Sequence, residues 1–266
     1  MPRRRATLWA MESMTYHQAK ALLEWHVDLG ADEAISDTPI NRYDVPKEAP
    51  KMAKPAPVAA AAPVVQQGPD PVAVAREMAG AAQDLEALKT ALGAFPHCDL
   101  KQGARNLVFS DGDPAARVII IGEAPGRDED REGRPFVGAA GQLLDAMLAA
   151  IDHGRGDAAH KVYITNVLPY RPPQNRDPKP DEVAMMLPFL QRHVELAAPE
   201  VLILMGNHAC HALTGQKGIT KLRGTWTEAL GLPALPMLHP AYLLRNPIAK
   251  RDAWADLLNL QARLRG

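Results

Sequence analysis

The stretch that most constrains the fold of this chain is residues 118–138, which read VIIIGEAPGRDEDREGRPFVG. Four apolar residues that favour β-structure run straight into Gly122 without alternating with polar residues, which is typical of a parallel strand buried on both faces. The glycines and Pro125 then end the strand and predict a tight loop whose backbone can approach a ligand closely. Because ligands bind beyond the carboxyl ends of strands in open α/β sheets, Glu123 and Phe136 are candidate site residues.

Three further apolar runs predict strands, at residues 161–166, 200–206 and 233–238. Helices are predicted between and after them, at 72–92, at 141–151, from Asp181 as the cap to 197, as a short helix from 207, and at 249–264. This alternation predicts an α/β fold, a three-layer α/β/α sandwich with a central four-stranded parallel sheet. The predicted strands end in loops of unusual composition, GEAPG, TNVLPYRPP, MGNHA and HPAYLLR, and their convergence at one sheet edge predicts the active site.

The composition divides the chain into three predicted parts. Residues 1–45 form an N-terminal helical segment with one amphipathic helix within 15–35, residues 46–71 form a flexible linker rich in proline and alanine, and residues 72–266 form the main domain. The N-terminal helix has no core of its own. We therefore expect it to dock on the main domain or to bind a partner protein.

Charge and cysteine content exclude several functions. A net charge of −1 and a pI of about 6.8 argue against a protein that coats nucleic acid by bulk charge, although an enzyme with a local basic rim is compatible with them. Two cysteines cannot form a disulfide framework, so a reducing, cytoplasmic location is expected. No apolar run has the length of a membrane span, and we expect a monomer that does not bind membranes.

Five motifs occur along the chain in the order GEAPG, PFVG, YITN, RPPQNRDP and HPAYLLR, and this order is the basis of a family resemblance. From about residue 92 onward the chain resembles the uracil-DNA glycosylase superfamily, and within it the family 4 type. The resemblance implies the fold of that superfamily and a monofunctional glycosylase that hydrolyses the N-glycosidic bond of deoxyuridine in DNA, the first step of base-excision repair. It also implies uracil-containing DNA as the partner. No lysine nucleophile occurs in the motifs, so strand cleavage is not expected.

The resemblance assigns roles to residues at three strand ends. His239 matches the motif histidine that stabilises the departing uracil anion at O2, and Asn166 matches the residue that reads N3–H and O4 and rejects cytosine. Phe136 resembles the aromatic residue that stacks on the extruded base, and Gly122 belongs to the same uracil-binding set. A structural role is the alternative for each of them: a loop histidine for His239, a turn-forming asparagine for Asn166 and a core phenylalanine for Phe136.

Glu123 and Ala124 occupy the loop after the first predicted strand. Other glycosylases of the superfamily carry a water-activating aspartate at the position that corresponds to Ala124, which we group with the uracil-binding residues. Glu123 is the candidate catalytic carboxylate in its place. Its role as general base, as electrostatic stabiliser of the sugar cation or as organiser of the loop stays open.

The DNA-binding residues are predicted around the last motif. Either Leu243 or Leu244 is expected to wedge into the space that the base vacates, with core packing as the alternative. Basic residues near the same rim are candidates for phosphate contacts, each with a solvated surface charge as the alternative. They are Arg171, Arg176, Lys217, Lys221, Arg223 and Arg245.

The chain departs from family 4 at the positions of the cluster ligands. Members of that family usually hold a four-iron, four-sulfur cluster with four cysteines. The matching positions here are Phe95, Cys98, Tyr170 and Met186, and one thiolate out of four cannot hold such a cluster. We therefore predict that no cofactor is bound and that these four side chains pack together as a small core.

The sequence is also compatible with other functions. A non-turnover protein that captures uracil-containing DNA is the main alternative. It is disfavoured because residues 127–134 run directly into PFVG without an inserted basic loop. The N-terminal helix could tether a repair or replication protein, alongside catalysis. Metal binding by the 207–211 stretch NHACH or by the acidic residues of 128–132 is disfavoured, and GEAPG lacks the glycine spacing of a dinucleotide-binding loop.

Overall fold

The computed structural model describes residues 20, 22–23, 70–156 and 159–265. The predicted N-terminal segment and linker lie outside these residues, apart from residues 20 and 22–23, which are helical, and 70–71. The chain divides into two units, Met1–Pro63 and Val64–Gly266, and the second carries all that follows. Among the described helices, none combines the length and the hydropathy that crossing a membrane requires.

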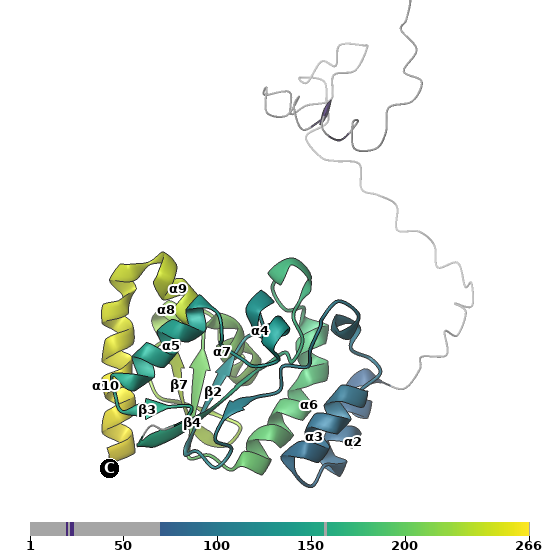
Figure 1. Ribbon diagram of the computed structural model, residues 1–266, viewed down its shortest axis with the longest axis horizontal. Helices are drawn as coiled ribbons and strands as arrows, with labels where there is room; N and C mark the ends of the chain where they lie inside the picture. Colours follow the sequence, from purple (N-terminus) through teal and green to yellow (C-terminus); the bar gives the residue numbers. More distant parts are fainter. Residues whose placement is uncertain (1–19, 21, 24–69, 157–158, 266) are drawn as a thin grey trace, which may run out of the picture. The chain divides into compact units, whose positions relative to one another are not determined.

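The sheet has four parallel strands at its centre, as predicted (Figure 1). In spatial order they are β4 (His160–Asn166), β2 (Val118–Gly122), β5 (Val201–Met205) and β7 (Leu232–Met237). Short strands that the sequence did not predict extend it. β1 (Asp111–Gly112) pairs antiparallel with β4, β6 (Thr227–Ala229) pairs antiparallel with β7, and β3 (His153–Gly154) pairs parallel with β4.

Helices cover both faces of the sheet, and each face has its own hydrophobic core. One core contains residues of α2 (Pro71–Ala81), α3 (Leu85–Ala94), α6 (Pro180–Ala197) and α7 (Asn207–Thr214). The other contains residues of α5 (Ala139–Ala149), α9 (Pro240–Arg245) and α10 (Lys250–Arg265). Along β2, Ile119 and Ile121 enter the first core while Val118 and Ile120 enter the second, which is why the strand reads as an unbroken apolar run.

Two helix predictions need correction. The helix predicted at 72–92 is two helices, because α2 ends at Ala81 and the side chain of Asp84 accepts the Ala87 N–H at 2.8 Å to cap α3. Asp181 lies in the first turn of α6 and is not its cap, since the helix begins at Pro180 and Glu182 accepts the Lys179 N–H.

Two stretches predicted as loops are helical. The acidic run after β2 forms α4 (Arg127–Glu132), and the residues after His239 form α9. The remaining short elements are α8 (Ile219–Leu222) and the 3-10 turns η1 (Asp99–Gln102), η2 (Pro173–Asn175) and η3 (Pro247–Ala249).

The strand register aligns the motif residues at one edge. Gly122 lies opposite Asn166 across β2 and β4, and Met205 lies opposite Met237 across β5 and β7. The loops that follow all four central strands therefore leave the sheet at its carboxyl edge, which confirms the predicted convergence.

Candidate active site

A cavity of about 420 Å³ lies at the carboxyl edge of the sheet. It is lined by the loop after β2, by the end of β4, by the RPPQNR loop and by the start of α9. The lining residues include Glu123, Ala124, Pro125, Gly126, Glu129, Phe136, Ala140, Asn166, Pro172, Asn175, Arg176, His239, Ala241, Tyr242 and Arg245. It therefore brings together the predicted residues Glu123, Ala124, Phe136, Asn166 and His239.

Asn166 ends β4 and is 6% exposed. Among the described residues, its Oδ1 atom is the one buried side-chain oxygen or nitrogen without a hydrogen-bond partner. Leaving a buried acceptor unpaired costs about 1–3 kcal/mol, and the position of this atom at the cavity wall allows a bound ligand to pair with it. Asn166 Oδ1 can thus accept a hydrogen bond from a ligand in the cavity.

Gly122 makes room for two neighbours of the cavity. A Cβ atom at this position would lie 2.3 Å from Asn166 Oδ1 and 2.6 Å from the Phe136 ring. Glycine is therefore required if the asparagine and the phenylalanine are to approach the strand end this closely. Gly122 thus provides space for these two side chains, and its uracil-binding role stays a prediction.

Phe136 is buried at 6% exposure and has a positive φ of 54°, an unusual conformation for a bulky residue. Such a residue costs about 1–3 kcal/mol in backbone strain and persists only where its surroundings fix it. Its ring lies 5.4 Å from the ring of His239 at an interplanar angle of 26°. The two rings therefore border the same space.

His239 is the N-cap of α9, and its Nδ1 accepts the backbone N–H of Ala241 at 3.1 Å. An accepting Nδ1 carries no proton, so the neutral ring carries its proton on Nε2. Burial and the charge of Arg245 lower the pKa of His239 to about 4, while the charge of Glu129 opposes this shift. At neutral pH the side chain is an uncharged Nε2–H donor.

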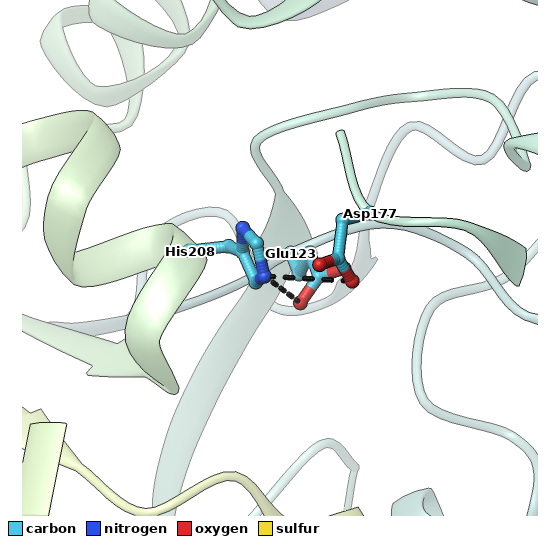
Figure 2. A group of neighbouring side chains, drawn as sticks. All are labelled: Glu123, Asp177 and His208. Carbon is cyan, nitrogen blue, oxygen red and sulfur yellow. Dashed lines mark ion pairs between the residues drawn. The ribbon is translucent and has the colours of Figure 1, made fainter. Parts of the chain in front are cut away.

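Glu123 follows β2 and faces His208 of α7 and Asp177 of the RPPQNRDP loop (Figure 2). His208 Nε2 lies 3.8 Å from Glu123 Oε2 and 3.6 Å from Asp177 Oδ1. Burial raises the pKa of Glu123, the charge of His208 lowers it, and that of Asp177 raises it. The carboxylate beside the cavity is thus held by a histidine that two acids share.

Among the described residues, the same three side chains are the group that could hold a cation. Their ligand atoms lie within 4.8 Å of one another. Asp177 is 82% exposed on its side chain, and the separations are those of ion pairs, so the group is explained without an ion. Within the acidic run, Glu129 and Asp130 instead accept backbone N–H groups, which accounts for that run structurally.

The two leucines predicted as candidates for the wedge, Leu243 and Leu244, differ in burial. Leu243 is fully buried in the core beneath α9, whereas Leu244 is 44% exposed. Successive helical residues point in different directions, and only Leu244 points outward. Leu243 as a DNA-binding residue is therefore corrected to a core residue, and Leu244 stays the candidate.

Of the basic residues predicted to contact phosphate, some are paired within the protein and others are exposed. Arg223 pairs with buried Asp256 and donates to the Asp252 carbonyl, and its role as a DNA contact stays a prediction. Arg171 donates from Nε to Asn175 Oδ1 at 2.7 Å, which orders the loop beside the cavity. Arg245 is exposed and lines the cavity, as a phosphate contact requires. Two lysines, Lys217 and Lys221, are exposed, and Arg176 pairs with Glu182.

The four positions predicted to correspond to the cluster cysteines share one buried core. Phe95, Cys98, Tyr170 and Met186 are each at most 7% exposed and belong to the same apolar cluster. Burial raises the pKa of the Cys98 thiol and raises that of Tyr170 to about 12, so both stay protonated. A phenyl ring, a phenol and a thioether supply no thiolate, so the donor set does not fit a four-iron, four-sulfur cluster.

Sequence reasoning missed several residues of this site. His208 comes from α7 and Asp177 from the loop after β4, and only the tertiary fold brings them to Glu123. Glu129 was treated as part of a charged run, and Arg155 lies in the GRGD stretch outside every motif. Of these residues, only Glu129 had a sequence feature that pointed to the site, which was its position between the GEAPG and PFVG motifs.

Comparisons with known proteins point to one family. The family model of the uracil DNA glycosylase superfamily matches residues 109–259. A type-4 uracil-DNA glycosylase of Sulfurisphaera tokodaii is 39% identical over 186 residues, covering 66% of this chain and 83% of that protein. Type-4 uracil-DNA glycosylases of Thermotoga maritima and Archaeoglobus fulgidus are 41% and 39% identical, over 56% and 60% of this chain and 77% and 82% of those proteins.

Proposed function

Because the chain belongs to the uracil DNA glycosylase superfamily, we propose that it is a monofunctional uracil-DNA glycosylase. It hydrolyses the N-glycosidic bond of deoxyuridine in DNA and so begins base-excision repair. The observation that carries the proposal is the buried, unpaired Oδ1 of Asn166 in a cavity that the Nε2–H donor of His239 also borders. Uracil presents a donor at N3 and acceptors at O2 and O4, which such a pair matches.

Asn166 reads the base. Its Oδ1 accepts the uracil N3–H while its amide nitrogen donates to O4. Cytosine has an unprotonated N3 and a donor in place of O4, so it would leave both groups facing a like partner. A site built to pair a polar edge rejects an analogue that lacks it by a large factor, because the buried groups stay unpaired.

His239 supports departure of the base. Cleavage of the glycosidic bond moves negative charge onto uracil O2, and a neutral Nε2–H donor stabilises that oxygen most when the charge has developed. The lowered pKa of His239 keeps the ring neutral over the physiological range. The imidazole therefore acts as a hydrogen-bond donor and does not need to transfer a proton.

Glu123 acts on the opposite partner of the cleaved bond. Charge on the sugar becomes positive as the base departs, and a carboxylate at the cavity lowers the energy of that state. With Ala124 supplying no carboxylate, Glu123 is also the group that orients the attacking water. Burial raises the pKa of Glu123 on balance, and the charge of His208 offsets part of that rise, which favours the charged form that both roles need.

DNA is held around the cavity. Leu244 enters the stack where the base has left, and Arg245 contacts phosphate, with Arg171 shaping the neighbouring loop. We further propose that the reaction needs no cofactor. Purified protein should then be colourless and free of iron, and a brown preparation with absorbance near 400 nm would contradict this. The cytoplasmic location, the monomeric state and a repair or replication partner for the N-terminal helix stay predictions.

The test is uracil release from a labelled oligonucleotide, followed by alkali to cut abasic sites. Wild type is compared with Asn166→Ala and His239→Ala, and His211→Ala serves as the matched control because that histidine is exposed on α7. We expect alkali-dependent cleavage that falls at least about tenfold in both site variants and is unchanged in the control. A stable DNA complex without release would instead favour the capture protein.

A further inference from the structure

The segment that carries Phe136 is held by charged side chains and not by secondary structure. We call residues 135–138 the platform segment. It joins α4 to α5 and contains the one aromatic residue of the cavity that adopts a positive φ. Because that conformation does not persist by itself, the contacts around the segment decide where the ring lies.

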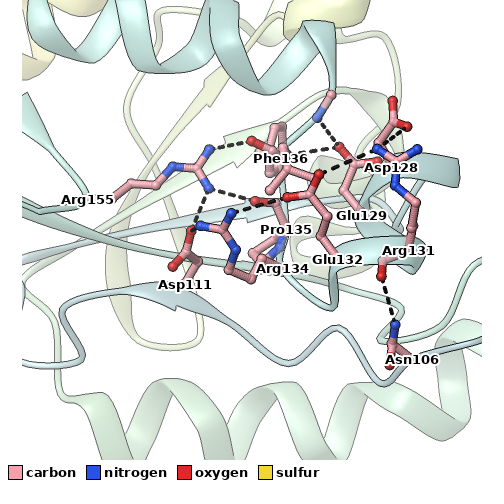
Figure 3. A network of polar contacts seen from close by, with 12 residues as sticks. Asn106, Asp111, Asp128, Glu129, Arg131, Glu132, Arg134, Pro135, Phe136 and Arg155 are labelled. Carbon is pink, nitrogen blue, oxygen red and sulfur yellow. Dashed lines mark hydrogen bonds and ion pairs between the residues drawn. The ribbon is translucent and has the colours of Figure 1, made fainter.

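Arg155 holds the first half of the platform segment (Figure 3). Its Nη1 donates to the Pro135 carbonyl at 2.7 Å and its Nη2 to the Phe136 carbonyl at 2.6 Å. The guanidinium is itself fixed, because Nη1 also donates to Asp111 at 2.9 Å and Nε to Asp145 at 2.8 Å. The side chain is 16% exposed, so these bonds are largely shielded from water.

Glu129 holds the second half. Its Oε1 accepts the N–H groups of Val137 at 3.0 Å and Gly138 at 2.9 Å, and its Oε2 accepts that of Gly126 at 3.0 Å. The carbonyls at the start of the segment therefore face a cation and the N–H groups at its end face an anion. Charged partners make the stronger hydrogen bonds of proteins, and a planar fork fixes direction as well as distance.

Close packing completes the arrangement. A Cβ atom at Gly141 of α5 would lie 1.7 Å from the Phe136 carbonyl oxygen, so the helix start leaves room for that carbonyl only because glycine is there. The ring on the other side meets Gly122 and His239. The platform segment thus has little freedom to move without moving the cavity wall.

We propose that Arg155, with Glu129 opposite it, is a positioning residue that sets the Phe136 ring at the orientation in which it stacks on the extruded uracil. The inference rests on the proposed function, since it names what holds one wall of the same site. Arg155 does not line the cavity, whereas Glu129 lies at the cavity wall with its carboxylate bonded to the platform N–H groups. Lysine cannot replace Arg155, because one ammonium group lacks the fork that bonds two successive carbonyls and two carboxylates in one plane.

The experiment compares Arg155→Lys with Arg134→Lys. Arg134 is the matched control because it pairs with Asp111 and Glu132 in the same network, at 56% exposure, without a contact to the platform carbonyls. Single-turnover uracil release, the affinity for uracil-containing duplex and the melting temperature are measured for each. We expect a loss of tenfold or more in the rate for Arg155→Lys, and a change under twofold for the control.

A double-mutant cycle separates positioning from general stability. If Arg155 acts through the ring, Arg155→Lys should cost less than threefold in a Phe136→Leu background. Guanidinium added to Arg155→Ala should restore part of the lost rate and should not affect Phe136→Leu. Equal losses in both backgrounds, or no loss in either, would overturn the proposal.

Failure of the proposed function would look different. Wild type would then release no uracil, and the same cycle would be run on affinity for uracil-containing against unmodified duplex. Coupling between Arg155 and Phe136 in that affinity would support the positioning role. Its absence would overturn it.

Discussion

Replacing Gly122 with alanine should disable the cavity while leaving the fold standing. The new Cβ atom would lie 2.3 Å from Asn166 Oδ1 and 2.6 and 2.7 Å from two carbons of the Phe136 ring, so both side chains must move. A lost base stack costs about 1–3 kcal/mol and an unmade buried hydrogen bond costs about 1–3 kcal/mol. At about 1.4 kcal/mol for each factor of ten, even the lower sum of about 2 kcal/mol lowers kcat/KM about 30-fold.

The assay is single-turnover uracil release, with thermal unfolding measured in parallel. Overpacking of this kind costs about 1–3 kcal/mol in stability, which is a melting temperature lower by several degrees and not an unfolded protein. Gly80→Ala is the matched control, because nothing lies within 4 Å of a Cβ atom at that exposed position in α2. A Gly122→Ala rate within threefold of wild type would refute the geometry of the base-binding wall.

Three further predictions concern other residues. His208→Ala removes the charge that lowers the pKa of Glu123, so the pKa of Glu123 rises. The acid limb of the kcat/KM profile then moves to higher pH, whereas Asp177→Asn moves this limb to lower pH. An acid limb that stays in place in both variants would contradict this. Leu244→Ala should slow uracil release from duplex DNA about tenfold and change the free energy of unfolding by less than about 0.5 kcal/mol. Leu243→Ala should instead lower the free energy of unfolding by about 2–5 kcal/mol. Urea unfolding measures both changes in stability. Burial lowers the pKa of His193 to about 4, so the unfolded chain binds a proton first as the pH falls below about 6.5, and about 3 kcal/mol of stability is lost between about pH 6.5 and 4. His193→Gln should flatten that part of the pH–stability curve, and an unchanged slope would count against the assignment.

The four central strands could be predicted from sequence because a parallel strand covered on both faces is an apolar run with a clear start and end. The edge strands could not, since Asp111–Gly112 and Thr227–Ala229 are two and three residues long and carry no apolar pattern. The helix over Arg127–Glu132 has no apolar stripe either. Contacts of Glu129 and Asp130 with distant backbone N–H groups hold it, and periodicity does not record such contacts.

The candidate site was predictable where a residue ends a strand. Asn166 and His239 occupy such positions, and the register of the sheet brings their loops to one edge. The choice between Leu243 and Leu244 was not predictable, because it depends on the rotation of a helix that the sequence suggested was a loop. Arg155 was invisible because its partners are carbonyl groups, which every residue has.

The packed core of Phe95, Cys98, Tyr170 and Met186 has a consequence for how the protein is made. A protein that needs an iron–sulfur cluster matures only as fast as its cell can assemble and deliver one, and oxidants that dismantle the cluster remove its support. Packing of side chains forms as the chain folds, needs no delivery of iron, and keeps the sulfur atoms of Cys98 and Met186 buried. Under the proposal made here, this repair activity would persist through iron starvation and oxidative stress, when cytosine deamination still continues to place uracil in DNA.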